Sequence, residues 1–122
     1  MTDEFRLDVA VRGAEHWVVV AGELDLATAP GLDDALGACL GHEALTGVVI
    51  DLTPCTFIDS TGVRSLVRFA ERARCAGAEL SIVCLPGSAA RFTLDLLGVG
   101  DTVPLHDSAD ALSLEGGPLG SI

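Results

Sequence analysis

The spacing of hydrophobic residues near the start of the chain predicts a β-hairpin. Residues 5–11 alternate between apolar and polar, which is typical of a half-buried strand with four apolar side chains on one face, Phe5, Leu7, Val9 and Val11. A turn at 13–15 separates this segment from a second apolar strand over 16–21. Two strands joined in this way predict an antiparallel hairpin, and a loop over 22–26 is expected to follow.

Farther along, hydrophobic residues recur every three or four positions and predict helices. The first helix runs from Thr28, its expected N-cap, to Leu40, and Gly41 ends it. Its apolar stripe consists of Leu32, Ala35, Leu36, Cys39 and Leu40. The second helix runs from about 61 to 76, and its buried face is expected to contain Val63, Leu66, Val67, Ala70 and Ala73.

A third helix is predicted between the turn at 86–88 and Gly98. Its apolar residues predict an inward face made of Ala89, Phe92, Leu96 and Leu97. A last short helix is expected to start at Asp107 or Ser108.

Three further segments are predicted strands and decide the fold class. Residues 48–52 are almost all apolar and β-branched, which predicts a central strand covered on both faces. Residues 80–85 form another buried strand, and 103–105 form a short edge strand that tolerates its proline. Strands that alternate with helices favour a mainly parallel sheet. We therefore expect a single α/β domain whose sheet is opened by an N-terminal hairpin and accompanied by about four helices.

The chain has 122 residues, which is the length of one domain. We expect an N-terminal extension over 1–4, the folded domain over 5–114 and a flexible tail over 115–122. The longest apolar run, 17–22, is far shorter than the ~20 residues that cross a bilayer. The acidic N-terminus does not resemble a secretory signal either. A soluble, cytoplasmic protein is expected.

Charge and composition exclude several classes of partner and cofactor. Eighteen acidic and seven basic residues give a net charge of −11, which repels phosphate groups, so we expect neither nucleic acid nor membrane as a partner. The four cysteines have no Cys-x-x-Cys spacing and lie in apolar contexts typical of small buried side chains: Cys39, Cys55, Cys75 and Cys84. The acidic residues form no metal-binding loop, and a phosphate loop would need the lysine that this chain lacks. We expect no cofactor and no metal.

Small polar residues cluster at the start of the second helix, in Asp59-Ser60-Thr61-Gly62. Such residues commonly cap backbone N–H groups, and a cap stabilises a helix by ~1 kcal/mol. Three capping side chains exceed what one helix needs, and Phe57 and Ile58 fasten the segment to the core. Ser60 therefore has two interpretations, as part of a cap or as a functional hydroxyl held on an exposed rim.

A catalytic role for Ser60 has little support. The sequence around it is not the Gly-x-Ser-x-Gly turn of hydrolases. A serine nucleophile needs a general base, and the three histidines stand in unrelated contexts that predict surface positions: His16, His42 and His106. We expect no enzyme, although only folding decides whether one of these histidines approaches Ser60.

Three blocks of residues together resemble one known family. They are Gly22-Glu23-Leu24-Asp25, Val48-Val49-Ile50-Asp51-Leu52 and Phe57-Ile58-Asp59-Ser60-Thr61-Gly62, and their order and spacing match the anti-sigma factor antagonists. These are bacterial domains of the STAS type (sulfate transporter and anti-sigma factor antagonist). The resemblance covers roughly residues 5 to 114 and implies the STAS fold for that range.

The resemblance also implies a phosphorylation switch at Ser60. In that family, the serine after the aspartate is phosphorylated by a partner that is both an anti-sigma factor and a serine kinase. The unphosphorylated antagonist binds this kinase and frees the sigma factor, and phosphorylation abolishes binding until a serine phosphatase resets the antagonist. The family often has serine where this chain has Thr61, which makes Thr61 a secondary candidate for phosphorylation.

Around Ser60 we expect a partner-binding surface made of Asp25, Asp59, Ser60, Thr61, Gly62, Arg64 and Arg68. Asp25 matches the family's first block, and a turn or cap residue is its alternative interpretation. Arg64, Arg68 and Arg72 recur every four residues on the polar face of the second helix. Such a stripe is usually a solvated face, and a docking site for an acidic patch of the partner is the alternative.

Two other functions stay open at the level of sequence. One is a STAS-type regulator in a different partner-switching complex, without sigma-factor control. The other is a small nucleotide-binding or hydrolytic enzyme that uses Ser60 and the helix N-terminus, against which the missing lysine and the missing general base argue.

Overall fold

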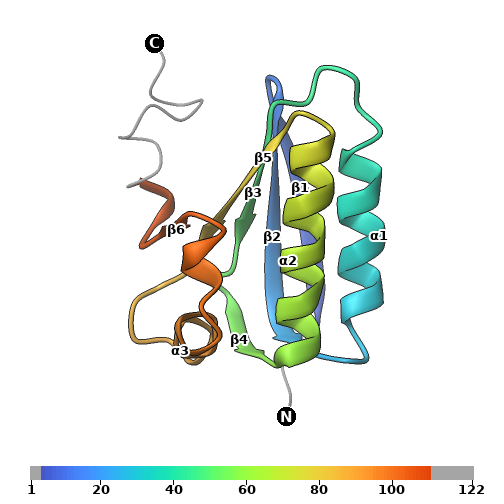
Figure 1. Ribbon diagram of the computed structural model, residues 1–122. Coiled ribbons are helices and arrows are strands. Elements are labelled where there is room, and N and C mark those ends of the chain that lie inside the picture. The colour runs from blue at the N-terminus through green and yellow to red at the C-terminus, as the bar shows by residue number, and fades with distance from the viewer. Residues whose placement is uncertain (1–3, 111–122) are drawn as a thin grey trace.

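The structure is a computed structural model that describes residues 4–110. Its centre is a sheet with the strand order β1-β2-β3-β5-β6, and β4 pairs with β2 off this path. The strands are β1 (Arg6–Arg12), β2 (Glu15–Leu24), β3 (Gly47–Asp51), β4 (Cys55–Ile58), β5 (Glu79–Val83) and β6 (Leu105–His106). β1 and β2 are antiparallel and the other pairs are parallel, which confirms the predicted sheet with its opening hairpin (Figure 1).

Three α-helices accompany the sheet within residues 4–110, namely α1 (Ala29–Cys39), α2 (Ser60–Cys75) and α3 (Ala89–Leu96). A short 3₁₀ helix, η1 (Val99–Asp101), follows α3. α1 and α2 lie side by side on the same face of the sheet, and α3 lies at the end where α2 begins (Figure 1). The sequence predicts about four helices. Residues 109 and 110 are helical, but the rest of the expected last helix and the expected tail lie outside the described residues.

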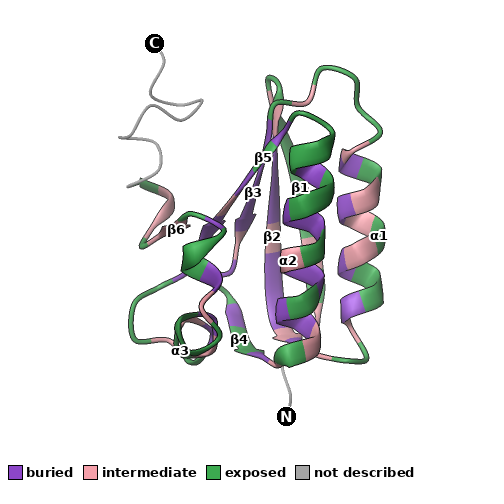
Figure 2. Cartoon of the chain, in the orientation of Figure 1, coloured by how far each residue is buried: buried purple, intermediate pink, exposed green. Residues whose placement is uncertain are grey.

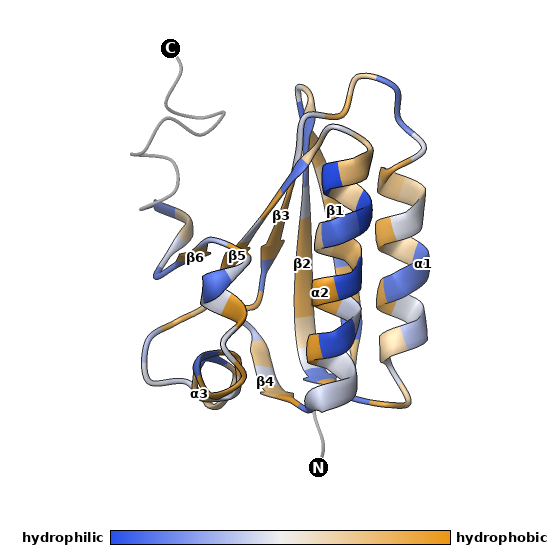
Figure 3. Cartoon of the chain, viewed as in Figure 1, coloured by the Kyte–Doolittle hydropathy of each residue, from blue (hydrophilic) through white to orange (hydrophobic). Residues whose placement is uncertain are grey.

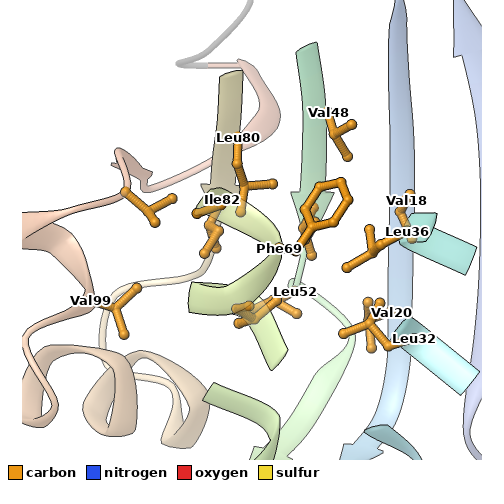
Figure 4. Packing of buried hydrophobic residues seen from close by; sticks show 14 of the residues in the cluster. Val18, Val20, Leu32, Leu36, Val48, Leu52, Phe69, Leu80, Ile82 and Val99 are labelled. Carbon is orange, nitrogen blue, oxygen red and sulfur yellow. The ribbon is translucent and has the colours of Figure 1, made fainter. Parts of the chain in front are cut away.

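The main core lies between the sheet and the helices (Figure 4). The inward stripes predicted for the first two helices are confirmed in their central residues, because α1 buries Leu32, Leu36 and Cys39 and α2 buries Val63, Leu66, Ala70 and Ala73. In Figure 2 both helices carry buried segments that alternate with exposed ones along their length. The opposite face of the sheet carries a smaller buried cluster of Trp17, Val49 and Val83, so β3 is covered on both faces as predicted.

The inward face predicted for α3 is wrong. The helix buries Ala90 and Leu94 instead, while Phe92 is 68% exposed and Leu96 is 70% exposed. Apolar residues lie on both sides of this short helix, so their periodicity does not determine which side is buried. The side with the larger residues was predicted to face inward. On the inner side, Arg91 Nη1 also donates to the Cys84 oxygen at 2.8 Å and to Asp107 Oδ1 at 3.1 Å, which holds the helix in this orientation.

The apolar face predicted for β1 is buried in its first half and exposed in its second half. Phe5 and Leu7 pack against the core, but Val9 is 51% exposed and Val11 is 61% exposed. β1 is the outermost strand of the sheet, with a neighbouring strand on one side only.

Two further expectations fail because pairing in space overrides local pattern. β2 continues through the expected loop to Leu24, since its last residues pair with β4. β4 is not among the predicted strands, because Pro54 and two threonines hide its strand character. Among the cysteines, Cys75 is exposed at the end of α2, and the other three are buried as expected. No helix within residues 4–110 is long and apolar enough to span a bilayer.

The difference between two phenylalanines provides a direct test of this packing. Phe69→Ala removes a ring that is 2% exposed, and we expect it to lower the free energy of unfolding by ~3–5 kcal/mol because it leaves a cavity. Phe92→Ala is the matched control on α3, where a change within ~0.5 kcal/mol is expected for an exposed side chain. Urea unfolding followed by circular dichroism measures both values. Equal losses in the two variants would contradict the orientation of α3.

Candidate functional site

Ser60 is the first residue of α2, and its side chain is exposed. The preceding residue, Asp59, is the N-cap: it has extended backbone angles, and its Oδ1 accepts a hydrogen bond from the Gly62 N–H at 3.0 Å. Asp59 is therefore the residue that caps α2, a role that the sequence left open among Asp59, Ser60 and Thr61. The hydroxyl of Ser60 stays on the surface, at the positive end of the helix dipole.

The start of α2 is packed directly against the end of β2. A Cβ atom added to Gly62 would lie 2.8 Å from both Cγ and the backbone oxygen of Leu24, and 2.9 Å from Cγ1 of Ile58. Any larger residue is therefore excluded at this position without movement of backbone. The Asp59 N–H also donates to the Leu24 oxygen at 3.2 Å. These contacts hold Ser60 on a rigid rim.

Asp25 lies in the loop that follows Leu24, next to this rim, but its hydrogen bonds are internal to the loop. Its Oδ1 accepts from the Ala27 N–H at 3.0 Å and from the Thr28 N–H at 3.2 Å. The Thr28 hydroxyl donates to the Glu23 oxygen at 2.8 Å, so Thr28 occupies the N-cap position of α1 without capping it. The structure therefore shows Asp25 as a turn residue, which is one of the two interpretations that its sequence context allowed.

The three arginines of the predicted stripe are exposed along α2. Arg64 lies one helical turn beyond Ser60, whereas Arg68 and Arg72 extend toward α1. Arg68 Nη2 is 3.5 Å from Asp33 Oδ2, and Arg72 borders the groove between the two helices. The structure thus brings Asp59, Thr61, Gly62 and Arg64 together with Ser60, and it places Arg68 and Arg72 progressively farther along the helix.

Histidines gather at the other end of the sheet from Ser60. His16 pairs with Val11 beside the hairpin turn, and its ring contacts that of His42 edge-to-face with centroids 4.5 Å apart. The expected surface position of His16 is wrong, because its side chain is buried in an inner strand and only 4% exposed. Burial, and secondarily the proximity of His42, lower the pKa of His16.

The folded chain brings neither of these two rings to Ser60, and His106 lies in β6, near the opposite edge of the sheet. Within residues 4–110, no group of three or more His, Cys, Asp or Glu side chains is arranged to hold a metal ion. The site therefore offers an accessible hydroxyl and a helix N-terminus, with acidic side chains beside them.

The expectation that Phe57 and Ile58 both fasten the site to the core is correct for Ile58, which is buried, and wrong for Phe57, which is exposed. Phe57, three residues before Ser60, is 45% exposed, and Leu26 in the neighbouring loop is 73% exposed. α3, which also exposes large apolar side chains, lies at the same end of the molecule (Figure 1). For α3, the sequence did contain a sign of exposed apolar surface, because this helix has two apolar stripes, each with i, i+4 spacing.

Comparisons with known proteins agree on one family. A model of the STAS domain matches residues 7–112 of this chain. The anti-sigma-F factor antagonist RsfB of Mycobacterium tuberculosis (strain CDC 1551 / Oshkosh) is 30% identical over 113 residues, which cover 91% of this chain and 89% of that protein.

Solved structures share the fold. The crystal structure of an anti-sigma factor antagonist from Mycobacterium paratuberculosis has a TM-score of 0.78 and 29% identity, with 90% of this chain and 92% of that chain covered. The structure of the Bacillus cell fate determinant SpoIIAA in the phosphorylated form has a TM-score of 0.64 and 17% identity, with 89% and 96% covered. At that identity, the likeness concerns the fold alone.

The contact between Gly62 and Leu24 leads to a stability prediction. Gly62→Ala forces a methyl group against backbone and is expected to cost ~1–3 kcal/mol of unfolding free energy. Gly31→Ala is the control, because its Cβ would meet only Cε2 of Phe5 at 3.6 Å; alanine there is expected to stabilise the helix by ~0.5–1 kcal/mol. Chemical denaturation compares the two. A neutral Gly62→Ala would contradict the close packing of α2 on β2.

Burial of His16 leads to a pH dependence. Because its folded pKa lies below the ordinary value of about 6.5, the unfolded state takes up the proton first. The contribution of His16 to stability is therefore complete above pH ~6.5 and is lost as the pH falls from there through the folded pKa. Thermal unfolding from pH 7.5 to 5 should show a slope that His16→Phe reduces. An unchanged slope in His16→Phe would refute the assignment.

Proposed function

This chain belongs to the STAS domain family, among its anti-sigma factor antagonists, and we propose that it works as a partner switch controlled by phosphorylation at Ser60. In the unphosphorylated state it binds an anti-sigma factor that is also a serine kinase, and the sigma factor is released. Phosphate on Ser60 ends this binding, and a serine phosphatase restores the active form. The role is regulatory rather than enzymatic, and we assign the cycle to the bacterial cytoplasm.

The observation that carries the proposal is the accessibility of the Ser60 hydroxyl compared with other serines near helix starts. Ser88, the N-cap of α3, donates to the Leu85 oxygen at 2.8 Å and accepts from the Arg91 N–H at 3.0 Å. Ser65, in the second turn of α2, is buried. Ser60 is exposed, and its capping work is done by Asp59. A kinase can therefore modify Ser60 without breaking a native contact of its side chain.

The fold tolerates a phosphate at this position. The first N–H groups of a helix have no intrahelical acceptor, and Asp59 occupies only that of Gly62. A phosphate on Ser60 thus lies near the remaining N–H groups and the positive end of the dipole, an interaction worth ~0.3–1 kcal/mol at an exposed site. Phosphorylation should leave α2 folded and change only the charge of the rim.

Toward a partner, the same phosphate has the opposite effect. It adds about −1.5 to −2 charge next to Asp59 and the Asp25 loop, which raises repulsion and the cost of removing water from the interface. Each ~1.4 kcal/mol lost weakens binding tenfold, so a few kcal/mol suffice to separate the complex. No large conformational change is required.

The proposed partner-binding surface extends from Asp25 and Asp59 through Thr61 and Gly62 to Arg64 and Arg68. In this surface Asp25 shapes the loop beside Ser60, and Arg64 offers a cation one turn along α2. The exposed Arg68–Asp33 pair is worth at most ~1 kcal/mol, so a partner can replace it with its own carboxylate at little cost. Thr61, which is half-buried, is a secondary site of phosphorylation.

Phosphorylation and binding assays test the switch. The full chain is incubated with each anti-sigma factor kinase of the source organism and ATP, and intact mass and peptide mapping locate the phosphate. We expect one phosphate, on Ser60. Ser60→Ala should bind the kinase with wild-type affinity in calorimetry, whereas Ser60→Asp should bind at least about tenfold more weakly, ~1.4 kcal/mol, because it adds negative charge to the rim.

Ser88 and Thr61 provide the controls. Thr61→Ala should still accept phosphate at Ser60, and Ser88 should stay unmodified because its hydroxyl is engaged. Phosphate on Ser88 instead of Ser60, or equal affinities of Ser60→Ala and Ser60→Asp, would sink the proposal. Ester or nucleotide turnover that disappears in Ser60→Ala would favour the enzymatic alternative.

A further inference from the structure

The groove between α1 and α2 contains a buried hydroxyl group without a partner. The groove has a volume of about 310 Å³, and six residues line it: Asp33, Leu36, Ser65, Arg68, Phe69 and Arg72. We call it the α1–α2 groove. Ser65 is 1% exposed, and its Oγ has no hydrogen-bond partner within residues 4–110. Buried polar groups in folded proteins are nearly always hydrogen-bonded, so an unpaired one in the wall of a groove indicates a place for a ligand.

Two core side chains give the α1–α2 groove an apolar wall beside this hydroxyl. Leu36 comes from α1 and is fully buried, and Phe69 comes from α2 and is 2% exposed (Figure 4). Pockets for small molecules typically have volumes of ~300–1,000 Å³ and mostly apolar walls with a few polar groups. The α1–α2 groove lies at the small end of that range, so it suits a small molecule with a compact apolar body.

The charged side chains of the α1–α2 groove leave one cation unpaired. Arg68 and Asp33 face each other from the two helices at 3.5 Å and largely offset each other's charge. Arg72 has no ion pair in the part of the chain that the structure describes. Its Nη2 would lie 3.8 Å from a Cβ added to Gly37, so the guanidinium reaches across to α1. In Figure 3, α2 carries strongly hydrophilic positions between hydrophobic ones.

These groups select a ligand with a single negative charge. A guanidinium matches the planar geometry of a carboxylate and binds it with two parallel hydrogen bonds. A doubly charged phosphate would instead meet the Asp33 carboxylate and, on the adjoining surface that shares Arg72, the carboxylate of Glu71. The net charge of −11 disfavours such a dianion further. The chemistry of the groove therefore favours a monocarboxylate.

We propose that the α1–α2 groove is a binding site for a small hydroxycarboxylic acid. Seven positions separate Ser65 from Arg72, which is ~10 Å along the helix axis, so a short ligand can extend from one to the other. Arg72 holds the carboxylate, and the Ser65 hydroxyl, which can both donate and accept, pairs with the hydroxyl at the other end of the ligand. The apolar chain between them packs on Leu36 and Phe69. This site is separate from the proposed switch, because neither Ser65 nor Arg72 belongs to the partner-binding surface around Ser60.

Titration of the full chain with 4-hydroxybutyrate tests the charged end of the site. Backbone amide signals in two-dimensional NMR are expected to shift in the segments that line the groove, around 33–37 and 65–72. Arg72→Gln should raise the dissociation constant at least about tenfold, because it removes the unpaired cation. Arg74→Gln is the matched control: it removes the same charge from the exposed surface of α2 outside the groove, and its dissociation constant should stay within about twofold of the wild type.

Ser65→Ala tests the buried end. Butyrate lacks the hydroxyl of 4-hydroxybutyrate and should bind the wild type about fivefold more weakly. In Ser65→Ala the two ligands should bind equally, with the affinity for butyrate unchanged. Without ligand, Ser65→Ala should raise the midpoint of urea unfolding, because it removes a buried group that has no partner. A lower midpoint would mean that the hydroxyl stabilises the fold itself, and it would overturn the site.

Two further probes and a crystal structure complete the test. The neutral 4-hydroxybutyramide should bind at least about tenfold more weakly than the acid, and equal binding would refute recognition of a carboxylate. Inorganic phosphate that binds as tightly as 4-hydroxybutyrate would overturn the proposed ligand class. Crystals grown with 4-hydroxybutyrate should show it between Arg72 and Ser65. If only water contacts the Ser65 hydroxyl there, or if no amide signal shifts in solution, the proposal fails and the switch at Ser60 is unaffected.

Discussion

The close packing of α2 on the end of β2 is the constraint on which the rest of the site depends. Gly62 allows the two backbones to approach, since any Cβ would collide with the Leu24 oxygen. Asp59 completes the junction in two directions, with its N–H on β2 and its carboxylate on the Gly62 N–H. The Leu24 oxygen and the Gly62 N–H are main-chain groups, so backbone geometry together with the Asp59 carboxylate determines the position of Ser60.

Such a junction suits control by charge. A hydroxyl on a mobile loop would let the chain reorganise after modification, and part of the effect on a partner would be lost. A phosphate added here by the proposed kinase would stay next to the Asp59 carboxylate and the acidic loop at Asp25. The helix N-terminus would moderate the cost to the fold, while a partner would experience the full change in charge. In the proposed switch, stability and affinity are thus separated at a single side chain.

A polar residue, Arg91, anchors the inner side of α3. Hydrophobic burial would favour turning Phe92 and Leu96 inward, yet Ala90 and Leu94 occupy the core. Arg91 is 19% exposed as a side chain and bonds to the Cys84 oxygen and to Asp107, and turning the helix would leave these groups without partners. The fold thus retains apolar surface on the outer side of α3.

Local patterns in the sequence predicted α1, α2 and the start of the site correctly, because helix stripes and caps depend on residues three or four positions apart. Asp59, Ser60 and Gly62 stand at the helix start where the sequence places them, and the parallel sheet follows from the order of strands and helices. Three features depended on segments far along the chain. β4 forms by pairing with the end of β2 at Leu24, and His16 is buried because β2 lies between β1 and β3. The orientation of α3 involves Asp107. Periodicity cannot express such contacts, since they exist only after the chain has folded. The sequence alone therefore determined which residue is presented, and the tertiary structure decided how rigidly it is held, because the contacts with Leu24 form only when β2 and α2 come together.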